Sequence, residues 1–402
     1  MSVPDRRSRP DIAYWSLIGA SFISSLGLGV YIPVLSLFAR SVGATAAMAG
    51  LLLSAAGAAR MIITVPGAYL AERFGRRPVI AASGILRGIV SIIISTCTTF
   101  PPLLGLFALL SLGWAVRYIS ILSAVAEMSG SQRRGRAIST LQASDLVGYS
   151  LGPAAGGLLA QRFGLNAPFI ALGVLEILCA CVVLVLFREP AALRHSNGRP
   201  SFGAIVTAVR DPFFRAIALV GLSQMVVRSG AYSVISPLYA ATKLNLAQAQ
   251  IGTAMTMSAV AVVLALQFAG RYLDRGRRWQ LIVIYTILMP ISLLSLSQTR
   301  SLFAFGAAQF LQGLSSGIIM PVPASYIAET TRTGSLTIAM GSLQTVSELG
   351  SVIGPVALGY IADITNGNYG VSYWAAAALV GAAGLTALVV MREPKRRPAA
   401  QA

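Results

Sequence analysis

The stretch "LQASDLVGYSLGPAAGGLLA" (Leu141–Ala160) recurs about 202 residues later as "LQTVSELGSVIGPVALGYIA" (Leu343–Ala362). The two copies share a Leu-Gln pair, a Gly-Pro pair and further glycines at matching positions. Each copy is as long as the roughly 20 residues that a helix needs to cross a bilayer. A repeat at half the chain length predicts two halves with the same fold. We predict an N-terminal bundle over residues 1–187, a cytoplasmic linker over 188–212 and a C-terminal bundle over 213–402.

The composition is that of a polytopic membrane protein. Of the 402 residues, 55% are hydrophobic and only 11% are charged, which is too little charge to cover a soluble domain of this size. Apolar runs of spanning length recur along the whole chain, and we count roughly twelve. The predicted fold class is an all-α membrane protein with twelve transmembrane helices in two pseudo-symmetric six-helix bundles.

The net charge of +18 follows membrane topology rather than nucleic-acid binding. With the N-terminus inside, most Lys and Arg residues fall in segments predicted to be cytoplasmic, as the positive-inside rule requires. The predicted outside loops hold only Arg40, Arg162, Lys243 and Arg300. We therefore predict a multi-pass protein of the cell (inner) membrane with cytoplasmic N- and C-termini. The lipid bilayer is an expected partner and nucleic acid is not.

No feature of the sequence predicts an enzyme, a cofactor or a metal site. The cysteines Cys97, Cys179 and Cys181 lie in or beside apolar runs, which is typical of small buried side chains. The sequence shows neither a phosphate-binding glycine loop nor a nucleophile–base set. The single histidine, His195, lies in the predicted linker. A non-transporting membrane enzyme or receptor is the least favoured class.

Two motifs carry the strongest functional signal. The first, "GAYLAERFGRR", has its defining positions at Gly67, Leu70, Glu72, Arg73, Gly75, Arg76 and Arg77. The second lies in the repeat and comprises Gly148, Gly152, Pro153, Gly156 and Gly157. With both motifs, the chain resembles the major facilitator superfamily, and most of all its twelve-helix drug:proton antiporter branch. The resemblance implies secondary active transport by alternating access, with proton-coupled export of a small organic molecule or drug. Because one chain holds both halves, we expect it to function as a monomer.

The loop motif is expected to act together with the end of the fourth helix. Glu72 is an acceptor suited to the N-terminus of a neighbouring helix, and the loop arginines are donors. Glu127 ends the predicted fourth helix, and Arg134 follows it closely. In the family this cluster latches the cytoplasmic side in the outward-open state. The alternative is a solvated loop that only sets topology.

Charged residues within the predicted spans are costly and are usually paired or functional. Their depths along the helices predict three pairs: Arg117 with Asp145, Arg87 with Glu176 as a structural pair, and Arg60 with Glu348. Because histidine is excluded, the proton-coupling candidates are Asp145, Glu348 and Arg117. A carboxylate takes up a proton more readily when it loses water and less readily beside a guanidinium. Permanent ion pairs that only specify packing are the alternative.

The family pattern is broken in the fourth helix. An arginine is usual one helical turn before a Gln-Gly pair, and the repeat offset places Phe107 at that position. Arg117 lies further toward the cytoplasm, so the resemblance does not transfer the proton-linked role to it.

The glycines of the second motif are spaced by four residues and form one stripe on a helix. Such a stripe lets a neighbouring backbone approach closely, and Pro153 removes a backbone donor and can bend the helix. We expect this helix to roll at the seam between the halves, with Asp145 on the glycine face. A tight contact that never moves is the alternative.

Polar side chains within the spans are candidates for a substrate cavity: Arg60, Arg228, Tyr31, Gln224, Tyr232, Gln309 and Gln312. The first helix has no charge and adds Ser21, Ser24 and Ser25. Interhelical hydrogen bonding is the alternative role for the uncharged members. Arg228, which lacks an obvious partner, favours with Arg60 an anionic or zwitterionic solute. An importer or uniporter of an organic anion on the same fold is therefore the second functional hypothesis.

Overall fold

The structure is a computed structural model that describes residues 9–188, 212–330 and 336–391. The first half contains α1 Arg9–Ser41, α2 Ala46–Phe74, α3 Arg76–Ser95, α4 Phe100–Met128, α5 Gly130–Phe163 and α6 Ala167–Leu186. The second half contains α8 Pro212–Val226, η2 Val227–Ile235, α9 Ser236–Thr242, α10 Gln248–Asp274, α11 Arg278–Ser297, α12 Leu302–Ile319, α13 Val322–Thr330, α14 Leu336–Ile364 and α15 Tyr369–Met391. The all-helical fold class is confirmed.

Eleven helical segments among the described residues are long and apolar enough to cross a membrane. One of them, Pro212–Thr242, joins α8, η2 and α9, and another, Leu302–Ile327, joins α12 and α13. The twelfth predicted span is α5, which has 34 residues but is more polar, because Ser, Gln and Arg residues interrupt its apolar positions. The linker predicted over 188–212 lies outside the described residues except for its two end positions.

Glycines end several of the helices where the chain must turn. Gly75 has φ +87° between α2 and α3, and Gly164 has φ +89° after α5. A residue with a Cβ is strained in this left-handed region, whereas glycine is not. The first of these glycines belongs to the loop motif, so its place in that motif has a backbone reason.

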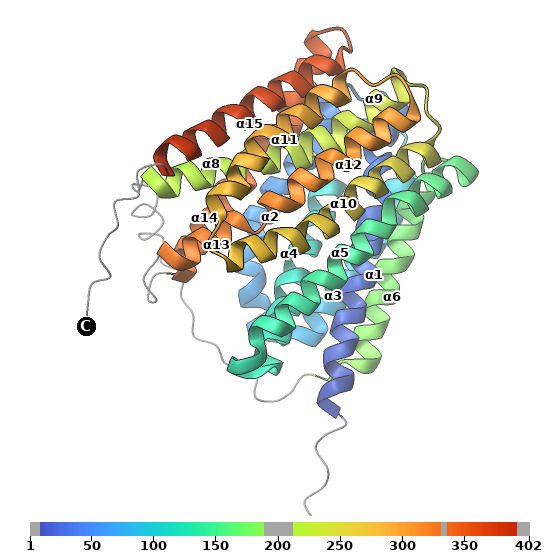
Figure 1. The fold of residues 1–402 in the computed structure, drawn as a ribbon. Coiled ribbons are helices and arrows are strands. Elements are labelled where there is room, and N and C mark those ends of the chain that lie inside the picture. Colours follow the sequence, from blue (N-terminus) through green and yellow to red (C-terminus); the bar gives the residue numbers. More distant parts are fainter. Residues whose placement is uncertain (1–8, 189–211, 331–335, 392–402) are drawn as a thin grey trace, which may run out of the picture.

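The two bundles meet at one end and diverge from it (Figure 1). We call the end where α1 ends and α2 begins the closed end. There the Asp363 carboxylate of α14 accepts hydrogen bonds from the backbone N–H groups of Ala46 and Ala47, at 3.0 and 2.8 Å. Arg40 donates to the Tyr369 hydroxyl at 2.6 Å. The carboxylate thus caps the N-terminus of a helix in the opposite bundle, where the helix dipole favours negative charge.

The glycine stripe of α5 packs against α1 of its own bundle, which corrects the prediction that it lies at the seam. A Cβ added at Gly148 would lie 2.6 Å from the Phe22 carbonyl oxygen, and one at Gly156 would overlap the Val30 carbonyl oxygen. The prediction of a seam position was wrong because four-residue spacing shows that the glycines share one face of the helix. It does not show which neighbouring helix that face contacts. Gly157, outside the four-residue spacing, instead approaches Gln248 of α10.

The seam at α5 is formed by the residues around its proline. A Cβ at Gly252 of α10 would overlap the Pro153 carbonyl oxygen. Next to it, the backbone N–H of Ala154 donates to the Thr256 hydroxyl of α10 at 2.9 Å. Pro153 has no backbone N–H to donate within the helix. The N–H of the next residue, Ala154, donates across the interface between the bundles.

Candidate functional site

Asp145 lies on the face of α5 that packs against α1, and two hydroxyl groups hold it. Ser21 and Ser25 donate hydrogen bonds to its Oδ1 atom at 2.5 and 2.9 Å. Its side chain is partly buried. The predicted pair with Arg117 is wrong, since among the described residues the carboxylate that forms an ion pair with Arg117 is Glu176, at 3.9 Å. Arg117 instead contacts Glu176 and Cys179, both of α6.

Glu176 is the centre of a buried charge cluster, which we define as Arg87, Arg117 and Glu176. The Arg87 guanidinium and the Ser24 hydroxyl both contact its Oε1 atom, the hydroxyl at 2.5 Å. Arg87 also donates to the Leu110 carbonyl at 3.2 Å. All three members of the cluster expose 3% or less of their side chains. A buried carboxylate between two guanidiniums offsets their charge, and removing either sign would leave the other uncompensated.

A second ion pair crosses the seam between the bundles. Arg60 of α2 lies 3.5 Å from Glu348 of α14, and both side chains are partly exposed, at 25% and 21%. The Ser351 hydroxyl donates to the same carboxylate at 2.8 Å. The Arg60 guanidinium also lies over the Trp114 ring, 5.8 Å from its centroid. This pair is the one charged contact between opposite bundles that the sequence predicted and the described residues also show.

A pocket of about 580 Å³, part of it open to solvent, lies between α5 and the second bundle. Its polar lining comprises Tyr149, Gln224, Arg228, Tyr232, Ser258, Gln312 and Ser316, and its apolar lining comprises Leu146, Ala259, Val262 and Met320. Four of the predicted cavity residues therefore line one pocket, with Arg228 exposed in it.

The pocket arginine stands on a π-helical segment that the sequence did not predict. The segment η2 covers Val227–Ile235, and the Ser233 hydroxyl donates to the Arg228 carbonyl, five residues earlier, at 3.0 Å. π-Helical turns are rare and are frequent at functional sites. Tyr232 donates to the Met255 carbonyl at 3.2 Å and thereby ties the segment to α10.

The pocket also contains residues that sequence reasoning missed. Tyr149 lies four residues after Asp145 on α5, and Arg228 stacks over its ring at 5.9 Å from the centroid. Ser258 of α10 donates to Gln312 at 3.0 Å. The signal for Tyr149 was its place inside the repeated stretch, one helical turn from the carboxylate. No comparable signal marked Ser258.

The comparisons with known proteins decide the family. The model of the Major Facilitator Superfamily matches residues 17–239 and 217–402. The chain belongs to this superfamily. It is 25% identical over 366 residues to an uncharacterized MFS-type transporter of Methanocaldococcus jannaschii, covering 86% of this chain and 89% of that protein. It is 23% identical over 346 residues to the quinolone resistance protein NorA of Staphylococcus aureus, covering 85% and 88%.

Solved structures of transporters share the major facilitator fold. The nucleoside transporter NupG matches with a TM-score of 0.81 at 12% identity, over 95% of this chain and all of that one. A bacterial homologue of the human lysosomal transporter Spinster, in an inward-facing and unoccupied conformation, matches with a TM-score of 0.81 at 15% identity, over 96% and 98%. The resemblance to the superfamily drawn from the motifs is confirmed, and the chain is a multi-pass secondary transporter rather than an enzyme.

Three predicted cavity residues of this major facilitator protein do not line the pocket. Arg60 is engaged at the seam. Tyr31 is buried and packs against Phe107 and Phe169, with ring centroids 6.1 and 5.9 Å away. Gln309 is fully buried, and neither of its amide atoms has a hydrogen-bond partner among the described residues. Tyr31 therefore belongs to an aromatic core, because its helix turns that side chain toward α4 and α6.

The superfamily loop motif makes its contacts inside the first bundle. Arg76 is buried and lies 2.6 Å from Glu127 at the end of α4. Arg77 donates to the Leu184 carbonyl of α6. Gly67 lies close to Val116, since a Cβ there would be 2.9 Å from the valine side chain. The contacts among the described residues thus join α3 to α4 and α6, and they do not connect this loop to the other bundle.

The remaining members of the predicted latch are at the surface or outside the description. Glu72 and Arg73 are exposed, and Glu72 forms no ion pair among the residues with described side chains. The side chain of Arg134, in the first turns of α5, lies outside the described residues. Among the residues that the structure describes, Glu72 therefore does not cap a neighbouring helix.

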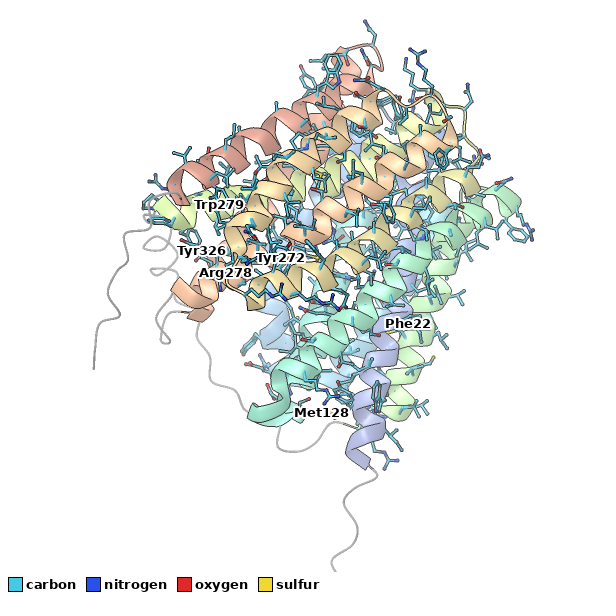
Figure 2. All side chains as sticks on the ribbon, viewed as in Figure 1. Phe22, Met128, Tyr272, Arg278, Trp279 and Tyr326 are labelled. Atoms are coloured by element: carbon cyan, nitrogen blue, oxygen red, sulfur yellow. The ribbon has the colours of Figure 1, made fainter. Side chains whose placement is uncertain are left out.

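Basic and aromatic side chains mark one end of the second bundle. Figure 2 labels Tyr272, Arg278, Trp279 and Tyr326, which come from α10, α11 and α13. Trp279 is 43% exposed. Aromatic and basic residues at the ends of spanning helices are typical of the membrane–water interface.

Proposed function

We propose that this transporter exports a small organic molecule in exchange for protons by alternating access. The observation that carries the proposal is the environment of Asp145, which accepts hydrogen bonds from two serine hydroxyls and lies on the helix that also supplies Tyr149 and Leu146 to the pocket. A proton site and a solute site on one helix can influence each other. The quinolone resistance protein NorA, to which the chain is similar, supports export.

The hydroxyl contacts suit a carboxyl group that changes its protonation state. A serine hydroxyl donates to a carboxylate and can accept from a carboxylic acid, so both states of Asp145 keep their hydrogen bonds. Glu176 differs, because protonating it would leave Arg87 and Arg117 without a counter-charge. Among the carboxylates inside the first bundle, Asp145 is therefore our proton carrier. Arg117 keeps the separate role of holding Glu176.

The second proton candidate, Glu348, lies at the seam and links protonation to movement of the bundles. Protonation would remove the charge that attracts Arg60, and the pair is one of the contacts that must part if the bundles separate there. Partly exposed pairs contribute little energy, of the order of 1 kcal/mol or less. We therefore assign Glu348 a gating role and Asp145 the stoichiometric proton.

The predicted orientation in the membrane determines which side of the membrane the pocket opens to. With cytoplasmic termini, the closed end faces outward and the pocket faces the cytoplasm, as an exporter needs for loading. The loop containing Gly67 and Gly75, with Glu127, would then close the cytoplasmic side in the opposite state. One chain supplies both bundles and the whole pocket, so we propose a functional monomer in the cell (inner) membrane.

Asp145→Asn is expected to abolish export driven by a pH gradient while solute exchange at equal pH continues. The amide keeps the hydrogen bonds but binds no proton, so proton uptake per solute should fall by at least tenfold. Proteoliposomes with an internal pH dye measure the proton flux, and a labelled solute measures exchange. Asp145→Glu, which keeps a carboxylate, is the matched control and should retain gradient-driven export.

Glu348→Gln in the same assay separates the two carboxylates. We expect slower gradient-driven export with unchanged stoichiometry. If Asp145→Asn and Glu348→Gln both retain gradient-driven transport at the wild-type rate, proton coupling through these groups is wrong. Gradient-driven accumulation in the opposite direction would favour the second hypothesis, import of an organic anion, which the exposed Arg228 supports.

Asp363→Ala is expected to open the closed end more often. The substitution removes two hydrogen bonds from a carboxylate to the N-terminus of α2, each worth about 1 kcal/mol or more. The ratio of open to closed molecules should therefore rise about thirtyfold. Spin labels at Ser41 and Ile364, in a variant with its three cysteines replaced by alanine, report the distance. Arg162→Gln, an exposed change at the same end, should leave the distribution unchanged. An identical distribution for Asp363→Ala would contradict the capping role.

A further inference from the structure

We infer that the pocket selects organic anions: a solute with an aromatic or otherwise flat apolar body and a carboxylate or similar oxyanion that Arg228 binds. The inference rests on the proposed function only in taking this pocket as the solute site. It adds the chemical class of the solute.

The first support is the charge balance of the pocket. Arg228 is exposed in it, and among the described residues no carboxylate lies within 4 Å of its guanidinium. Its nearest described interaction is with the Tyr149 ring, 5.9 Å from the centroid. A cation–π contact does not neutralise the charge. A base at membrane depth normally finds an acid, and here that acid is supplied by the solute.

The second support is the absence of competing acids from the lining. Every other polar residue that lines the pocket is a neutral Gln, Ser or Tyr. The carboxylates that lie within the spans are engaged elsewhere: Asp145 with serines, Glu176 with arginines and Glu348 across the seam. An ammonium group in the pocket would meet Arg228 without any compensating negative charge. The electrostatics therefore exclude simple cations and favour anions.

The third support is the orientation of the neighbouring donors. The Gln312 side-chain oxygen accepts from Ser258 at 3.0 Å, which leaves its amide N–H groups for a solute oxygen. The guanidinium offers a planar fork of donors that matches a carboxylate. Tyr149 and Tyr232 contribute aromatic surface to the lining, and Val262 and Met320 contribute apolar surface. The pocket thus binds the head of the solute by charge and its body by stacking.

The experiment measures binding without any pH gradient. Purified transporter in detergent is titrated calorimetrically with benzoate, 1-naphthoate and 9-anthroate, and with the methyl ester and the matching arylmethylammonium of each. We expect at least one acid to bind about tenfold or more tightly than its ester, and the ammonium compounds not to bind. The inference is overturned if no acid binds, if acid and ester bind equally, or if an ammonium compound binds more tightly than the acid.

Substitution assigns the effect to the arginine. Arg228→Gln should weaken binding of the acid about tenfold or more and leave the affinity for the ester within about twofold. Arg228→Lys keeps the charge without the fork and should give an intermediate affinity. Arg300→Gln, a change at an exposed base outside the pocket lining, is the control. Equal acid affinities for the wild type and Arg228→Gln would also overturn the inference.

The result is independent of the coupling test. Anion binding with proton coupling intact in Asp145→Asn would refute the proposed proton route and leave the solute class standing. Cation binding with coupling lost in Asp145→Asn would refute the solute class and leave the proton route standing.

Discussion

Gly156→Ala is expected to prevent the transporter from assembling into a stable protein. A Cβ at this position would overlap the Val30 carbonyl oxygen, a backbone atom of α1 that cannot rotate away. The added methyl group must push α5 and α1 apart along their whole contact, including Gly152 against Gly29. Overpacking typically costs 1–3 kcal/mol, and a clash with backbone places this variant at about 3 kcal/mol or above.

Expression with a fluorescent fusion and size-exclusion chromatography measures the loss, and the thermal midpoint in detergent measures any surviving protein. Gly105→Ala on α4 is the matched control, because no atom lies within 4 Å of a Cβ built there. It should behave as the wild type. Gly148→Ala, with a Cβ 2.6 Å from a carbonyl oxygen, should also destabilise the protein, but less than Gly156→Ala. A monodisperse Gly156→Ala protein with the wild-type midpoint would disprove the backbone-to-backbone packing of α1 and α5.

Glu176→Gln is expected to destabilise the first bundle by about 3–5 kcal/mol, the usual cost of removing one partner from a buried ion pair. The variant keeps the shape of the side chain but leaves Arg87 and Arg117 together without negative charge. Two like charges in a low-dielectric interior also repel each other. The thermal midpoint of the purified protein and the denaturant needed for inactivation both measure the change.

A double variant that returns the cluster to its wild-type net charge tests whether charge is the cause. Combining Glu176→Gln with Arg87→Gln lowers the net charge of the cluster by one relative to the single variant, so part of the lost stability should return. Glu72→Gln, at an exposed position, should leave the midpoint unchanged. If Glu176→Gln is as stable as the wild type, or if Arg87→Gln worsens it, the buried charge cluster does not stabilise the bundle.

The fold was predictable because the features that indicate it can be read from the order of residues along the chain. Three signals could be recognised from the order of residues alone. They are the length of the apolar runs, the repeat between Leu141–Ala160 and Leu343–Ala362, and the loop motif at Gly67–Arg77. Even the depth of charges was recovered, since Arg60 meets Glu348.

The candidate site was only partly predictable, because rotation about a helix axis decides it. Arg117 and Asp145 have matching depths but contact different partners, Glu176 and Ser21, and Tyr31 packs in an aromatic core instead of lining the pocket. The π-helical segment shifts the register of the residues after Val227 in a way that no periodicity of 3.6 describes. Asp363 was missed because its role is to cap a helix of the other bundle, which no local pattern encodes.

The two halves of this duplicated chain contain different parts of the candidate site. The buried charge cluster and Asp145 lie in the first copy, whereas most of the pocket lining comes from the second copy. If this pocket binds the solute, as proposed, substitutions in the second copy would change the range of transported compounds and leave the ionisable interior of the first copy intact.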